Sequence, residues 1–191
     1  MTQAATTRTW QDLTIPAPGT FALDTAHTRI GFVARHLMVS KVRGHFGEFS
    51  GTITVTEDPL ASGVEVTIRT ASIDTGVDKR DQHLRGGDFL DVESFPEMTF
   101  RSLRITDQDG ADFTLLGELT IKGITREVEL AVTFEGLATN PWGGEVLAFS
   151  ARTEIDREEF GMTWNQTLET GGVLVGKKVT IEIEAEATRQ R

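Results

Sequence analysis

Apolar and polar residues alternate along most of this chain, which is the pattern of β-strands with one buried and one exposed face. The clearest run covers residues 178–185, where Val, Ile and Ala alternate with Lys, Thr and Glu. Clusters of glycine, proline and aspartate separate the runs and predict turns. The alternation predicts about eight antiparallel strands, drawn from nine stretches at residues 21–23, 27–39, 41–55, 64–68, 98–106, 113–121, 128–134, 147–155 and 178–185.

These strands are predicted to close into a barrel. Several run to about ten residues, whereas ~5–6 residues is usual for a strand. The pattern contains no long amphipathic helix to cover their apolar faces, so the sheet must fold on itself. We therefore expect an all-β fold, an extended eight-stranded antiparallel β-barrel over residues 19–191, preceded by a flexible N-terminal arm at residues 1–18. Three glycines, at positions 44, 47 and 51, predict a bulge or sharp bend in the strand at residues 41–55.

The segment from Ile73 to Phe100 interrupts the alternation with many charged residues. A short helix is predicted from Thr75 to Arg85, with Thr75 as its N-cap and Gly86-Gly87 at its end. We interpret this segment as a helical lid over one end of the barrel.

The apolar face of the predicted helix carries a polar group, because Asp81 lies on the same side as Val77 and Leu84. An ion pair is expected to hold the lid shut. It would join Arg80 to Asp81, or join these residues to the later Arg157-Glu158 pair.

The charge of the chain excludes some partners. The net charge is −10 and the pI is about 4.9, which disfavours nucleic acid and stable docking on anionic lipid. There is no cysteine, so neither a thiolate metal site nor a thiol nucleophile can form. No apolar run approaches ~18 residues and the N-terminus lacks a signal-peptide core, so we expect no stable membrane insertion and a cytoplasmic location.

Candidate catalytic and metal-binding residues are few. The histidines at positions 27, 36 and 45 are nine residues apart, which places consecutive members on opposite strand faces, so no metal site or other cofactor is predicted. The sequence contains no G-x-S-x-G motif, which would place a nucleophilic serine on a sharp turn. Acid–base chemistry through Asp74, Asp81, His83 or Asp156 is conceivable, but ion pairing of the lid is the favoured interpretation.

Large apolar side chains in the irregular segments have two interpretations. They either plug one end of the barrel or line the entrance for an apolar ligand, and the pattern does not choose between these. The residues concerned are Phe89, Phe95, Phe100, Phe160 and Trp164.

Four ordered blocks between Phe21 and Ala187 resemble the YceI-like, polyisoprenoid-binding family. They read DTAHTRIGFVARHLMVSKVRGHFGEFSGTI, IDTGVDKRDQHLRGGDFLDVESFPEMTF, GELTIKGITREVEL and IDREEFGMTWN. The resemblance implies a lipocalin-like barrel with a hydrophobic tunnel that holds a long isoprenoid chain. It implies neither catalytic residues nor a metal. Some family members are periplasmic and carry a signal sequence, and the family often has tyrosine where this chain has Phe21.

On this basis the predicted function is non-enzymatic binding of a polyisoprenoid lipid, either a polyprenyl phosphate or the tail of an isoprenoid quinone, for carriage or storage. His36, Arg80 and His83 are predicted to contact the polar head, and Phe89, Phe160 and Trp164 to form the mouth. The predicted wall consists of Phe32, Ala34, His36, Val66, Ile68, Phe100, Leu119, Val132, Phe134, Phe149 and Ile181.

Alternatives stay open at this point. The first is an enzyme that acts on a quinone or lipid through His36, Asp81 or His83. A haem- or metal-binding barrel and a filled barrel without a ligand are the others. A homodimer is also compatible with the exposed edges of an incompletely closed barrel.

Overall fold

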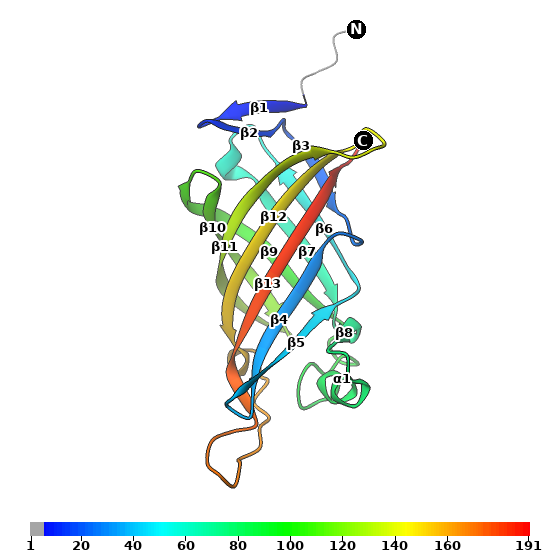
Figure 1. The fold of residues 1–191 in the computed structure, drawn as a ribbon, viewed down its shortest axis with the longest axis vertical. Coiled ribbons are helices and arrows are strands. Elements are labelled where there is room, and N and C mark those ends of the chain that lie inside the picture. Colours follow the sequence, from blue (N-terminus) through cyan, green and yellow to red (C-terminus); the bar gives the residue numbers. More distant parts are fainter. Residues whose placement is uncertain (1–5) are drawn as a thin grey trace.

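The computed structural model describes residues 6–191, so the first five residues of the predicted arm lie outside the described part of the chain. Strands dominate this part, together with a short α-helix and short 3-10 helices (Figure 1). In chain order the elements are β1 (Thr7–Trp10), β2 (Leu13–Pro16), β3 (Gly19–Leu23), β4 (Arg29–His36), β5 (Ser40–Phe46), β6 (Phe49–Val55), η1 (Pro59–Ala61), β7 (Gly63–Arg69), η2 (Thr70–Ser72), β8 (Ile73–Asp74), α1 (Asp78–Arg85), β9 (Glu97–Asp109), β10 (Asp112–Ile121), β11 (Ile124–Thr139), β12 (Glu145–Asp156), η3 (Arg157–Phe160) and β13 (Val175–Arg189).

The strands close into an elongated antiparallel barrel, which confirms the predicted fold class. Around the barrel the order is β12, β11, β10, β9, β7, β6, β3 and β13, and β13 pairs back onto β12. This last seam is long, because it runs from Val146 opposite Thr188 to Asp156 opposite Lys178. Figure 1 shows the tilted strands wrapping around the vertical axis, with α1 at the lower end and the β1–β2 hairpin at the upper end.

Two of the eight strand positions are each filled by two strands placed end to end. β3 and β4 both pair with β13, while their partners across the sheet are β6 and β5. β5 and β6 separate at Gly47, whose amide donates to the carbonyl of Ser72 at 3.1 Å instead of extending the ladder. The bend predicted from the glycines is therefore present, and the single strand predicted over residues 41–55 is two strands.

The predicted N-cap of the helix was wrong. α1 begins at Asp78, and Val77 occupies the cap position without a side-chain hydrogen bond. Thr75 lies three residues before the helix, where its amide donates to the Asp81 carboxylate at 2.9 Å. The carboxylate of Asp81 thus accepts a hydrogen bond from the segment that leads into the helix.

The ion pair predicted for the lid was also wrong. Asp81 is 4% exposed, and its carboxylate accepts hydrogen bonds from both the amide and the hydroxyl of Thr75. Arg80 donates to the hydroxyl and the carbonyl of the same threonine, at 2.7 and 3.0 Å. Hydrogen bonds to Thr75, and those from Arg85 to the carbonyls of Ala71 and Ile73, therefore anchor α1 in place of the predicted ion pair.

Residues 6–18 contain paired strands where the sequence predicted a loose arm. β1 and β2 form a two-stranded sheet of their own, in register from Thr7 opposite Pro16 to Trp10 opposite Leu13. The domain boundary predicted at residue 19 stays a prediction.

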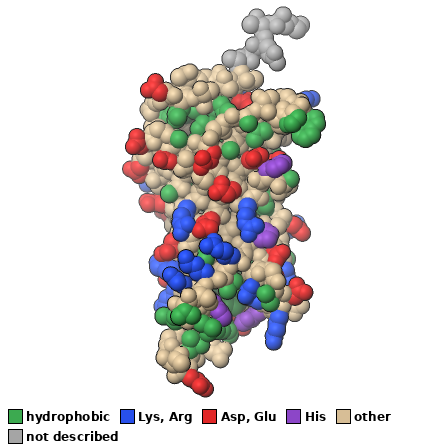
Figure 2. Space-filling model, in the orientation of Figure 1, with side chains coloured by type: hydrophobic (Ala, Val, Ile, Leu, Met, Phe, Trp, Pro, Cys, Tyr) green, Lys and Arg blue, Asp and Glu red, His purple; other side chains and the backbone are tan. Residues whose placement is uncertain are grey.

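Charged side chains cover the middle of the face shown in Figure 2, and hydrophobic side chains are exposed mainly toward its two ends. Within the described part of the chain, no helix is long and apolar enough to cross a membrane.

Candidate ligand-binding cavity

An apolar cavity of about 390 Å³ runs through the barrel. Each of the strands β1–β13 contributes to its lining, as do η1, α1 and η3. This volume falls in the range of small-molecule sites, roughly 300–1,000 Å³. Several inward aromatic residues, including Phe32, Phe100 and Phe134, are only half-buried although they point into the barrel. The barrel is therefore hollow rather than filled by its own side chains.

The predicted wall and the observed lining agree at most positions. Alternation along a strand fixes which side chains point inward, so a correct strand assignment yields correct inward positions. The predicted residues that line the cavity are Phe32, Ala34, Val66, Ile68, Phe89, Phe100, Leu119, Val132, Phe134, Phe149 and Ile181.

Five predicted site residues do not line the cavity: His36, Arg80, His83, Phe160 and Trp164. His36 is the last residue of β4, where the pairing with β13 is irregular. The enzyme alternative relied on His36, Asp81 and His83, and none of these three reaches the lining. The structure thus brings no predicted acid–base group to the interior.

The lower end of the cavity is closed by an aromatic cluster beneath α1. The ring centroid of His83 lies 5.1 Å from that of Phe89 and 4.7 Å from that of Trp164, in edge-to-face arrangements. The residues predicted as a mouth sit here, and Phe160 is 1% exposed. At this end Phe89, Phe160 and Trp164 therefore act as a plug, one of the two interpretations of the aromatic residues, whereas Phe100 lines the cavity wall.

Arg157 is a buried cation at the closed end. It is 2% exposed and borders the cavity. Its guanidinium donates to four backbone carbonyls, those of Met162, Trp164, Gly176 and Val175, at 2.6, 2.9, 2.9 and 3.3 Å. Burial lowers the pKa of Arg157, and the carboxylates of Glu158 and Asp156 oppose that shift. The side chain ties the segment before β13 to η3.

The cavity reaches the surface at the opposite end. Among the lining residues of the described chain, Leu60 in η1 and Gly110 in the β9–β10 turn are exposed. The lining near Arg157 is instead buried, for example at Leu90, Ile121 and Met162. A ligand would therefore enter between η1, the β9–β10 turn and the β1–β2 hairpin.

The hairpin contributes lining residues that the sequence analysis missed. Trp10, Leu13, Ile15 and Pro16 all border the cavity. A signal was present in the three apolar residues of an otherwise polar stretch, but no alternation marked strands there.

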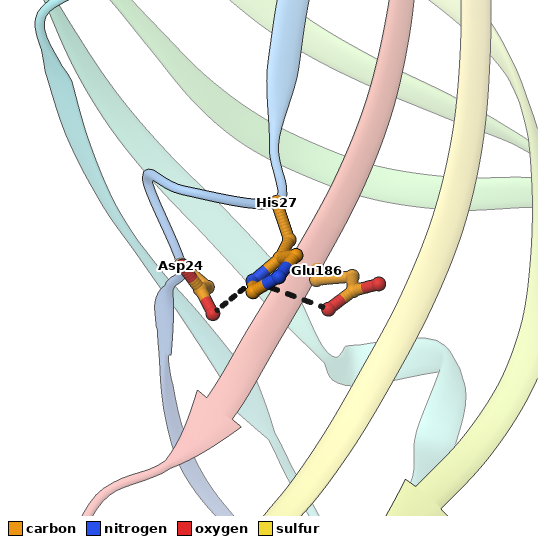
Figure 3. Close-up of side chains that lie close together, drawn as sticks. All are labelled: Asp24, His27 and Glu186. Atoms are coloured by element: carbon orange, nitrogen blue, oxygen red, sulfur yellow. Dashed lines mark hydrogen bonds and ion pairs between the residues drawn. The ribbon is translucent and has the colours of Figure 1, made fainter. Parts of the chain in front are cut away.

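Asp24, His27 and Glu186 form a surface cluster outside the cavity (Figure 3). Their potential ligand atoms lie within 4.8 Å of one another, and this is the one group of metal-ligand type within residues 6–191. The imidazole Nδ1 of His27 lies 2.8 Å from the Asp24 carboxylate and 4.0 Å from that of Glu186. The hydrogen bond between His27 and Asp24 spans the turn between β3 and β4. The cluster therefore stabilises the turn that joins these two strands, which lie end to end in the barrel.

We expect the pKa of His27 to lie above its ordinary value of 6.5, because the Asp24 carboxylate accepts its hydrogen bond and, with Glu186, stabilises the imidazolium. The same bond lowers the pKa of Asp24 below 3.8. The contribution of the Asp24–His27 pair to the stability of the folded protein is therefore complete between the two ordinary pKa values, 3.8 and 6.5. It is lost as pH rises through the folded pKa of His27, or falls through that of Asp24.

An NMR titration of the His27 ring measures this shift. Asp24→Asn should return the pKa toward 6.5, and Glu186→Gln should move it less, since its effect is the smallest favourable one. A His27 pKa at or below 6.5 in the unmodified protein would contradict the pairing.

Comparisons with known proteins are consistent across sequence and structure. The family model described as "YceI-like domain" matches residues 21–187. A UPF0312 protein of Staphylococcus aureus (strain MRSA252) is 40% identical over 168 residues, which cover 87% of this chain and 95% of the relative.

Two solved structures share the fold. The crystal structure of Burkholderia cenocepacia BcnA superposes with a TM-score of 0.74 at 26% identity, over 87% of this chain and 99% of that chain. A polyisoprenoid binding domain from Saccharophagus degradans, implicated in plant cell wall breakdown, has a TM-score of 0.68 over 89% of this chain and 98% of that one. At 12% identity, this second likeness concerns the fold alone.

Proposed function

The chain belongs to the YceI-like family, and from this premise we propose that it binds a polyisoprenoid lipid in the barrel, without catalysis, as a carrier or storage protein. The observation that carries the proposal is the hollow interior, whose lining is apolar along almost its whole length. Removing apolar surface from water contributes about 25 cal/mol per Å² before the costs of binding. A long tail can therefore bind firmly with few polar contacts.

The ligand we propose is a polyprenyl phosphate or an isoprenoid quinone, with its tail in the barrel. The elongated barrel suits an extended chain, and the polyisoprenoid binding domain of Saccharophagus degradans has the same fold. The three residues predicted to contact the head, His36, Arg80 and His83, lie outside the lining. With the lower end plugged and the upper end open, we infer that the head group lies toward the upper end.

The acid–base alternative loses its support, because His36, Asp81 and His83 do not line the cavity. Oδ1 of Asp81 moreover accepts two hydrogen bonds from Thr75. The cytoplasmic location and the homodimer stay predictions.

Native mass spectrometry of the purified protein, followed by organic extraction, tests the ligand class. We expect a bound species whose homologues differ in mass by one isoprene unit, and the head group will distinguish a phosphate from a quinone. Where the protein emerges empty, undecaprenyl phosphate and ubiquinone are added to it. Failure of both to bind would contradict the proposal.

A further inference from the structure

The β1–β2 hairpin lies across the open end of the cavity and precedes the family match, which begins at residue 21. Its side chains Trp10, Leu13 and Ile15 border the cavity from above. The family fold therefore does not account for this hairpin, and its place at the opening raises the question of what it does there.

The hairpin is held to the barrel rim by a latch at Arg8. The guanidinium of Arg8 donates to the carbonyls of Thr56 and Glu57, the latter at 2.6 Å, immediately before η1. Its Nε donates to the carbonyl of Pro16 at 3.2 Å and so also joins the two strands of the hairpin. The Glu57 carboxylate lies 3.5 Å away and is exposed. A single side chain thus connects the hairpin to one side of the opening.

Residues 17–18, which follow the hairpin, are fastened to the barrel and form its base. Arg189, near the end of β13, donates to the carbonyls of Ala17 and Pro18 at 2.8 and 3.1 Å. The same guanidinium pairs with Glu145 at 2.6 Å and lies over the ring of Phe21 at 4.5 Å. The chain that leaves the hairpin is therefore fastened to the barrel independently of Arg8.

The hairpin itself adds little internal stability that would hold it closed. It has four residue pairs in register, and an isolated two-stranded hairpin is marginal in water. Its position therefore depends on the Arg8 latch and on the apolar contact of Trp10, Leu13 and Ile15 with the cavity. Both can be released without disturbing the eight barrel positions.

From these contacts we infer that the hairpin is a lid that supplies the end wall of the ligand site and controls exchange of the ligand. Trp10, Leu13 and Ile15 touch the bound chain, and release of Arg8 from Thr56 and Glu57 opens the site by movement about the base at residues 17–18. The inference rests on the proposed function for the identity of the natural ligand, but the lid can be tested with any apolar probe.

The test uses the full chain and the fluorescent probe N-phenyl-1-naphthylamine. The probe is loaded, and its transfer to phosphatidylcholine vesicles is followed by stopped flow. Arg8→Met keeps the apolar stem of the side chain and removes the latch, so we expect release about tenfold faster than from the unmodified protein. Arg126→Met, the same change at an exposed arginine in β11, should leave the rate unchanged.

Hydrogen exchange of the unmodified protein gives a second measurement that needs no variant. Bound probe should protect the amides of residues 7–15 about tenfold, because a ligand that touches the lid stabilises its closed position. Unchanged protection and release from Arg8→Met within about twofold of the unmodified rate would overturn the lid. If the probe results hold while undecaprenyl phosphate and ubiquinone do not bind, the lid stands and the proposed function fails. If the probe does not bind at all, the lid inference fails, while the proposed function is decided by the two lipids.

Discussion

Replacing Arg157 by methionine will lower the free energy of unfolding by about 3–5 kcal/mol. Of the four carbonyls that its guanidinium satisfies, that of Val175 also accepts from Asn165 at 2.7 Å, whereas the other three lose a charged donor. A buried acceptor left without a partner costs roughly 1–3 kcal/mol, and the partly buried carbonyls of Trp164 and Gly176 cost less than that of Met162. Methionine retains much of the packing volume, so the loss reports mainly on the hydrogen bonds.

Urea unfolding with linear extrapolation measures this loss. Arg126→Met is the matched control, because Arg126 is exposed and its one side-chain hydrogen bond goes to the neighbouring carbonyl of Thr125. Its expected effect is below about 0.5 kcal/mol. A loss of less than about 1 kcal/mol for Arg157→Met would mean that the carbonyls find other donors, and that the plug does not depend on this cation.

The plug explains why the two ends of the barrel behave differently. At the lower end, Arg157 and Asp81 hold irregular chain by hydrogen bonds to backbone groups, and the rings of Phe89 and Trp164 pack against each other. At the upper end, the hairpin is held by Arg8, by its base at Arg189 and by the apolar contact of its side chains with the cavity. Local opening draws on the least stable part of a fold, so ligand exchange is expected at the hairpin.

The barrel could be predicted from the sequence because the two-residue alternation of apolar and polar side chains along a strand is a local property. Where alternation was clear, as at Phe32 and Ala34 or at Val66 and Ile68, the inward faces followed, and these residues line the cavity. The prediction lost accuracy where a strand reached the end of the barrel. His36 continues the alternation of Ala34, but it is the final residue of β4 and lies beyond the lining.

The helix and hairpin could not be placed by such local rules. Thr75 is a good N-cap residue, yet its hydroxyl and amide are used by Asp81, six residues later, so a tertiary contact displaced the cap. The β1–β2 turn has positive φ at Gln11 and Asp12, of 47° and 66°. Such turns are recognised by Asn-Gly or Asp-Gly, and neither is present here. The sequence pattern therefore predicts a loose arm where the structure has a hairpin.

Because the barrel is hollow and lined by half-buried aromatic residues, a charged side chain in its interior is expected to weaken ligand binding strongly. Phe134 and Phe149 face each other across β11 and β12 with ring centroids 5.3 Å apart, and both line the cavity in its open half. Ala131, three residues before Phe134 on β11, is exposed and does not line the cavity. The two positions allow one substitution to be compared on the two faces of a single strand.

Phe134→Asp will weaken the binding of undecaprenyl phosphate and ubiquinone by at least about 100-fold, whereas Ala131→Asp will leave it unchanged. A carboxylate in the lining must either lose its water when the tail binds or keep water in the path of the tail, and each costs several kcal/mol. Titration with each lipid measures the affinity, and thermal unfolding verifies that both variants are folded.

Ala151→Phe separates lost volume from added charge. Ala151 lines the cavity next to Val132, and a phenyl ring there fills space without introducing a polar group. Because a folded barrel with a partly filled interior cannot hold a long tail, affinity for both lipids should fall with this variant too. Should Phe134→Asp and Ala151→Phe both fold and bind the lipids as the unmodified protein does, the tail must lie outside the barrel, since charge and volume in its interior would then be irrelevant to binding.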